Sequence, residues 1–75
     1  MKKKSNRKEF DCHGLSYGQV EDLLPNWLLS NQDRMPMYII TGRSESMRVI
    51  VGTILSELGM HWAIKDINPG EIIVL

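Results

Sequence analysis

Phe10-Asp11-Cys12-His13-Gly14 is the stretch of sequence that best indicates how the chain folds. Side chains alternate between the two faces of a β-strand, so Phe10 and Cys12 share one face while Asp11 and His13 share the other. The alternation predicts a strand over residues 9–13, with two apolar groups toward a core and two titratable groups outside it. The strand is expected to lead into a helix, and open α/β sheets commonly hold their ligands at such connections.

The composition is that of one small globular domain. The chain has 75 residues, of which 43% are hydrophobic, and it contains no apolar run long enough to span a membrane. Its single cysteine, Cys12, excludes an internal disulfide, and no apolar stretch follows the basic start as it would in a signal peptide. We therefore expect a cytoplasmic protein without a membrane partner; a monomer is the favoured oligomeric state, although the sequence does not decide it.

The zero net charge of the whole chain conceals a basic start and an acidic body. Residues 9–75 carry four Lys or Arg against nine Asp or Glu, a net of −5. We expect residues 1–8 to form a flexible basic tail, which either binds nucleic-acid phosphates or is only a solvated terminus. Its basic residues are Lys2, Lys3, Lys4, Arg7 and Lys8.

A first helix is predicted over about residues 17–29. Gly14 suits the turn before it, and Ser16 and Gln19 have the spacing of a capping box at its start. Pro25 falls inside the helical pattern, so the helix is expected to kink, with a break into two pieces as the alternative. The predicted apolar stripe consists of Val20, Leu23, Leu24, Trp27 and Leu28.

The second strand is predicted at residues 37–41, a continuous apolar run that follows a polar connection ended by Pro36. A strand, a helix and a second strand in this order form a right-handed βαβ crossover with parallel strands. The C-terminal ends of the two strands should therefore lie at the same edge of the sheet.

The remaining chain predicts one more helix and two more strands. A second helix follows residues 42–46, with Gly59 in the place of a C-terminal cap. Residues 62–67 can form a third strand, residues 68–71 a type II turn, and residues 72–75 a fourth, antiparallel strand. The apolar positions of the second helix are Met47, Ile50, Val51, Ile54, Leu55 and Leu58.

The expected fold class is α/β, in the form of an α+β two-layer sandwich with the element order βαβαββ. The first and third strands carry charged residues and belong at the edges, whereas the second and fourth are apolar. This gives a mixed four-stranded sheet of order 1-2-4-3 with both helices on one face.

Two motifs resemble those of the Smr (small MutS-related) domain, whose members include nucleases that nick DNA or cleave RNA. Residues 10–14 resemble its hydrophobic-Asp-x-His-Gly signature. Residues 41–44, Thr-Gly-Arg-Ser, resemble its second motif, except that Ser44 replaces the last glycine. The resemblance covers residues 9–75 and implies a two-layer fold similar to the C-terminal domain of translation initiation factor three.

The predicted topology brings five residues to one sheet edge beside the start of the second helix: Asp11, His13, Thr41, Gly42 and Arg43. Helix N-termini and guanidinium groups bind phosphates, and an imidazole exchanges protons near neutral pH. Asp11 and His13 together supply only two ligands, so we expect at most a loosely held Mg²⁺ or Mn²⁺ and no structural zinc.

These residues support two hypotheses about function. The first is an endonuclease in which Asp11 and His13 are catalytic and Gly14, together with residues 41–44, binds the phosphate of RNA or DNA. The second is a non-catalytic nucleic-acid-binding or adaptor module with the same fold. It is suggested by Ser44, which stands where the family motif has a glycine. Three other residues have simpler interpretations: His61 as exposed, Trp27 as core, and Trp62 as either core or a surface on which a base stacks.

Overall fold

The computed structural model describes residues 8–64 and 70–75 of the chain. Within these ranges the elements follow the expected order, with one short 3₁₀ helix, η1, in the polar connection before the second strand. The elements are β1 (Lys8–Asp11), α1 (Tyr17–Ser30), η1 (Gln32–Arg34), β2 (Met37–Ile40), α2 (Glu45–Glu57), β3 (Trp62–Ile64) and β4 (Glu71–Val74).

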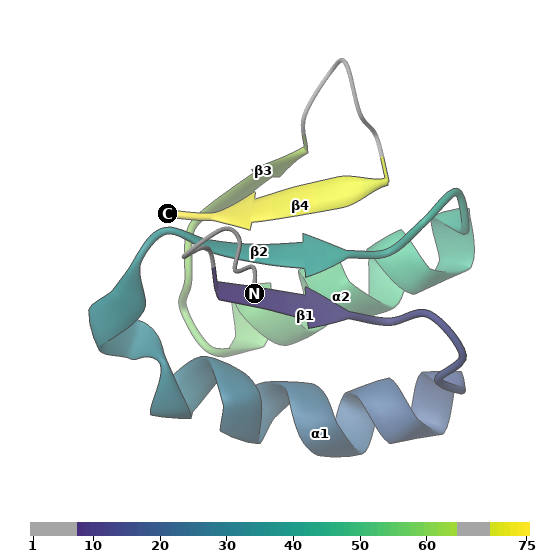
Figure 1. Cartoon of the computed structure of the whole chain (residues 1–75), viewed down its shortest axis with the longest axis horizontal. Coiled ribbons are helices and arrows are strands. Elements are labelled where there is room, and N and C mark those ends of the chain that lie inside the picture. The colour runs from purple at the N-terminus through teal and green to yellow at the C-terminus, as the bar shows by residue number, and fades with distance from the viewer. Residues whose placement is uncertain (1–7, 65–69) are drawn as a thin grey trace, which may run out of the picture.

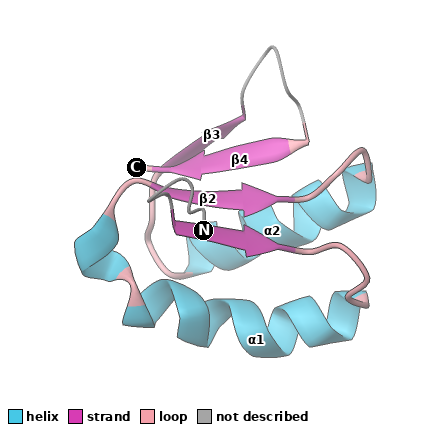
Figure 2. Ribbon diagram, in the orientation of Figure 1, coloured by secondary structure: helices cyan, strands magenta, loops and turns pink. Residues whose placement is uncertain are grey.

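The strands form one mixed sheet of order β1-β2-β4-β3. β1 and β2 are parallel, and β4 is antiparallel to both β2 and β3. Both helices cover the same face of the sheet (Figure 1; Figure 2). The predicted two-layer α+β architecture and its strand order are therefore confirmed.

The core lies between the sheet and the two helices. The rings of Phe10 in β1 and Trp27 in α1 pack edge to face, with 5.4 Å between their centroids, and this contact joins the edge strand to the first helix. In the described sheet, alternate strand residues face this layer, as a period of two requires. The buried apolar residues are Cys12, Val20, Leu24, Leu28, Met37, Ile39, Met47, Val51, Ile54, Leu55, Ile72 and Val74.

The first helix forms as predicted and is not broken at Pro25, but its apolar stripe does not bury Leu23. Ser16 and Gln19 form the predicted capping box, each side chain accepting from the other residue's backbone N–H. The helix continues through Pro25 to Ser30, so it is not broken into two pieces. Leu23, however, is 50% exposed, because the helix buries a narrower stripe than the spacing predicted.

Three strands differ from their predicted bounds. β1 begins at Lys8 and ends at Asp11, so Lys8 pairs with Met37 in the sheet instead of ending a tail. β2 ends at Ile40 and β4 begins at Glu71, one residue earlier than expected in each case. The proposed third-strand residues 65–67 and the turn at 68–69 lie outside the described residues. In the described part of the chain, neither helix is both long and apolar enough to cross a membrane.

Candidate functional site

Asp11 and His13 lie together at the end of β1. The Asp11 carboxylate Oδ1 accepts a hydrogen bond from the His13 backbone N–H at 2.9 Å and lies 3.6 Å from His13 Nδ1. The side chains of His13 and Asp11 are 84% and 60% exposed. The backbone therefore holds the carboxylate beside an imidazole that solvent reaches freely.

His13 lies in a turn, not in the predicted strand, because β1 ends at Asp11. The Leu15 N–H donates to the Cys12 carbonyl at 3.0 Å, which closes a four-residue turn with His13 and Gly14 at its centre. Gly14 has φ 75°, a left-handed conformation that favours glycine. The alternation of burial nevertheless continues past the strand, since Cys12 is buried and His13 is exposed.

The loop after β2 is held against the start of β4. The backbone N–H groups of Thr41 and Gly42 both donate to the Gly70 carbonyl, at 2.8 and 3.1 Å. The buried Thr41 hydroxyl lies 3.1 Å from the Gly42 carbonyl oxygen and 3.2 Å from that of Gly70. A Cβ on Gly70 would meet the Gly42 carbonyl oxygen at 3.1 Å, so a glycine fits this approach best.

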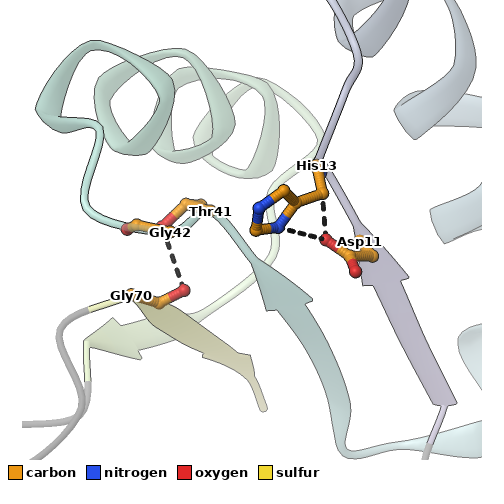
Figure 3. Close-up of polar contacts among 5 residues, drawn as sticks. All are labelled: Asp11, His13, Thr41, Gly42 and Gly70. Carbon is orange, nitrogen blue, oxygen red and sulfur yellow. Dashed lines mark hydrogen bonds and ion pairs between the residues drawn. The ribbon is translucent and has the colours of Figure 1, made fainter.

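Figure 3 shows how these two strand ends meet. The His13 ring projects from the end of β1 toward the loop at Thr41 and Gly42. The parallel pairing of β1 and β2 continues just past Asp11, where the Cys12 N–H donates to the Ile40 carbonyl at 2.9 Å. We call Asp11, His13, Thr41 and Gly42 the strand-end site.

Arg43 and Ser44 lead from this loop into α2. Ser44 is the N-cap of the helix, and its hydroxyl accepts from the Met47 N–H at 3.1 Å. Its φ of −78° is open to any residue, so the replacement of glycine at this position strains nothing. Arg43 is exposed and has no polar partner among residues 8–64 and 70–75.

Two observations limit an anion site at the start of α2. The Gly42 N–H, expected to contact a phosphate, already donates to Gly70, so it is not available without a rearrangement. Glu45 occupies the first turn of the helix and supplies the negative charge that the helix dipole favours there. Arg43 and the first amides of α2 are what remains for a phosphate.

Of the basic residues predicted for phosphate binding, the structure describes Lys8 and Arg43. Lys8 begins β1, three residues before Asp11, which is about 10 Å along an extended strand. Lys2, Lys3, Lys4 and Arg7 lie outside the described residues. Of the predicted cations, Arg43 is the one that follows directly on the site.

The described residues offer little for a metal ion. No group of three or more His, Cys, Asp or Glu side chains is gathered anywhere in the two described ranges. Asp11 and His13 supply two donors at an exposed position, which fits a weakly held Mg²⁺ or Mn²⁺ shared with a phosphate, but not a closed protein site.

Cys12 packs under the site and does not take part in it. The thiol is buried, and burial, with a smaller contribution from the nearby Asp11 carboxylate, raises its pKa from 9.0 to about 11. A thiol in this state is a poor nucleophile. The interpretation of Cys12 as a packing residue agrees with this environment.

Sequence reasoning missed the role of Gly70, which it assigned only to a turn. The Pro69-Gly70 pair was a sufficient signal for a turn, but a pairing between positions 42 and 70 depends on the sheet register. No protein-family model, curated protein or solved structure matches the chain. The geometry of its own residues therefore carries the functional argument.

Proposed function

We propose that this protein is a small Smr-type endonuclease that cleaves phosphodiester bonds of RNA or DNA at the strand-end site. The observation that carries the proposal is the exposed His13 imidazole, with the Asp11 carboxylate fixed 3.6 Å from its Nδ1. Hydrolytic enzymes use such pairs because the carboxylate orients the ring while the other ring nitrogen transfers the proton. The resemblance of residues 10–14 and 41–44 to the two Smr motifs supports the same reaction class.

In this proposal His13 is the general acid or base. With RNA, the 2′-hydroxyl loses its proton and forms a new bond to phosphorus, and the 5′-oxygen leaves as it takes up a proton. With DNA, water replaces the 2′-hydroxyl as the attacking group. Asp11 orients the imidazole through Nδ1, which leaves Nε2 to face the substrate.

Arg43 is the group we assign to the phosphate, since a guanidinium binds two phosphate oxygens at once. The Ser44 amide, in the loop after β2, and the turn at Gly14, in the loop after β1, are assigned to binding the nucleic-acid backbone. Thr41 and Gly42 hold the loop after β2 in place through their hydrogen bonds to Gly70. A loosely bound Mg²⁺ or Mn²⁺ would add positive charge near the phosphate, and the proposal requires no step through it.

The direct test is cleavage by the purified protein. Labelled single-stranded RNA, nicked DNA and supercoiled DNA are each incubated with and without Mg²⁺, and the product ends are identified. A 2′,3′-cyclic phosphate, or the 2′- or 3′-phosphate to which it hydrolyses, would indicate attack by the RNA hydroxyl, whereas a 5′-phosphate beside a 3′-hydroxyl would indicate attack by water. If none of these substrates is cut, the proposal fails.

A non-catalytic nucleic-acid-binding module is the second candidate, because two features at the start of α2 weaken the hold on a phosphate that cleavage would require. The Gly42 amide is occupied by Gly70, and Glu45 opposes an anion in the first helical turn. We expect Ser44→Gly to cost only a few tenths of a kcal/mol through the weaker cap. If this substitution raises cleavage, Ser44 limits turnover; unchanged activity removes the motive for the second candidate.

The basic start of the chain is proposed to strengthen binding to RNA or DNA in the cytoplasm. Five cations, Lys2, Lys3, Lys4, Arg7 and Lys8, would release up to five counterions, at a slope of about −0.7 per contact for a single strand. Replacing Lys2, Lys3, Lys4 and Arg7 with Gln should flatten the salt dependence of binding and leave cleavage at saturation intact. An unchanged affinity and slope would contradict this role.

A further inference from the structure

β3 presents backbone hydrogen-bonding groups at the outer edge of the sheet. The His61 carbonyl accepts from the Leu75 N–H at 2.8 Å, and antiparallel strands alternate bonded and non-bonded pairs. Ala63 therefore bonds to β4, whereas the N–H and C=O groups of Trp62 and Ile64 point away from the sheet. No described strand pairs with this edge (Figure 2).

A groove of about 580 Å³ runs beside this edge, between β3 and α2. Two of its apolar side chains are strongly exposed for their type, Ile64 at 42% and Val49 at 61%. Single exposed apolar residues need no explanation, but here they line one hollow next to an unpaired strand edge. The lining residues are Glu45, Arg48, Val49, Gly52, Thr53, Ser56, Glu57, Trp62 and Ile64.

The wall of the groove is fixed by packing. The Trp62 ring lies so close to α2 that a Cβ on Gly52 would be 2.9 Å from it, and the ring N–H donates to the Ser56 hydroxyl at 3.4 Å. Because Gly52 has no side chain, the ring can seat against the helix. The groove is therefore preformed, which lowers the entropy cost of binding.

The ends of the groove are acidic. Glu45 and Glu57 lie at the two ends of α2, twelve residues apart, which is about 18 Å along a helix axis. An extended peptide covers this length with about six residues at 3.3 Å each. Arg48 lies near the Glu45 end, where it donates to the Gly42 carbonyl at 3.5 Å.

We propose that β3 accepts an extended peptide as an added strand, with apolar residues at alternate positions and a Lys or Arg at each end. The outward groups of Trp62 and Ile64 would bond its backbone, as in strand addition at other sheet edges. Its apolar side chains would cover the groove, and its end cations would meet Glu45 and Glu57. The inference does not depend on the reaction proposed for His13.

Charge and the apolar pattern distinguish this occupant from two others. Antiparallel pairing of β3 with β3 of a second copy would place the carboxylates at one end of α2 against those at the other end of its symmetry mate, and like charges repel. The first seven residues of this chain are basic but have Met1 as their one apolar residue, so they lack the alternating pattern.

The probe is the labelled peptide Lys-Thr-Ile-Thr-Ile-Thr-Lys, whose lysines and isoleucines share one face of a strand. A control of identical composition, Lys-Ile-Ile-Thr-Thr-Thr-Lys, puts the isoleucines on opposite faces. We expect saturable binding of the first peptide, at least tenfold tighter than the second, by fluorescence anisotropy. Equal binding of the two, or no binding by the first, overturns the proposal.

Amide hydrogen exchange locates the binding. The probe should slow exchange at Trp62 and Ile64 and leave Ala63 unchanged, because Ala63 is already bonded to β4. Protection of Trp62 and Ile64 in the free protein would mean that the edge is already covered, by the chain itself or, if dilution removes the protection, by a second copy. Either result overturns the proposal.

Matched charge variants test the two ends. Glu45→Gln with Glu57→Gln should weaken binding of the probe about three- to tenfold, as expected for two exposed ion pairs. The control, Glu21→Gln with Asp22→Asn on the exposed surface of α1, removes the same charge and should leave binding unchanged. An equal loss in both variants would show a general charge effect and contradict the assigned ends.

Discussion

The strand-end site and the β3 groove expose opposite kinds of chemistry on the same small sheet. At the strand-end site two titratable side chains stand in water, and the loop beneath them is fixed by hydrogen bonds to Gly70. Along the β3 groove the exposed surface is mostly apolar between its acidic ends, and a tryptophan ring packed on α2 forms its wall. The exposed side chains of Asp11 and His13 therefore contribute little to the stability of the fold, whereas the Trp62 ring that forms the groove wall also packs the sheet against α2.

Removing the groove wall should have the largest effect on stability. Trp62→Ala deletes a ring packed against Gly52, and we expect a loss of about 2 to 3 kcal/mol in the free energy of unfolding. His13→Ala removes a side chain that is 84% exposed and should change stability by less than about 0.5 kcal/mol. Urea unfolding of the two variants measures both values, and similar losses would contradict the contrast.

The reactivity of the Cys12 thiol measures how well the layer beneath the strand-end site excludes water. With its pKa raised from 9.0 to about 11, the folded protein at pH 8 should hold about a hundredfold less thiolate than an unfolded chain. Iodoacetamide should therefore alkylate Cys12 at least a hundredfold more slowly in buffer than in 8 M urea.

The same shift predicts the direction of the pH dependence. Because the folded state holds the thiol proton more tightly, stability should fall as pH rises from about 9 toward 11. Cys12→Ser replaces the thiol by a group that does not ionise in this range, and this part of the pH dependence should disappear. Both predictions depend on the burial of the Cys12 thiol, so fast alkylation by iodoacetamide in buffer without urea would contradict them by showing that Cys12 is open to solvent.

A smaller effect is expected from the backbone of the loop after β2. Gly42→Ala places a side chain at φ 69°, which costs about 1 to 2 kcal/mol although no atom lies within 4 Å of the new Cβ. The control is Gly18→Ala in α1, where the Cβ also meets nothing and φ is negative, and it should stabilise the protein by up to about 1 kcal/mol. Equal shifts of the melting temperature in the two variants would show that the left-handed backbone at position 42 does not require a glycine.

Much of the fold could be predicted because local signals and the hydrophobic period agree. The capping box at Ser16 and the run at residues 37–41 each point to one element, and charge on the outer strands led to the order 1-2-4-3. The end of β1 was placed two residues late because burial keeps alternating through the turn. Leu23 was misplaced because periodicity does not say how wide a stripe the sheet covers.

The strand-end site was predictable in membership but not in its contacts. Parallel strands required the ends of β1 and β2 to meet, which brought His13 and Gly42 to one edge. The use of the Gly42 amide by Gly70 depends on the register between β2 and β4, which no local pattern encodes. The β3 groove was missed for a similar reason, since it requires the packing of Trp62 against Gly52.

The proposed reaction is tested most directly by single-turnover cleavage with two histidine variants. His61 is also exposed, and its position at the start of β3 is at the opposite end of the sheet from His13, so His61→Ala is the matched control. On whichever of the RNA and DNA substrates the parent cuts, we predict that His13→Ala is slower by about 10²- to 10⁴-fold, while His61→Ala retains the parent rate. Equal cleavage by the parent and His13→Ala would contradict the proposal.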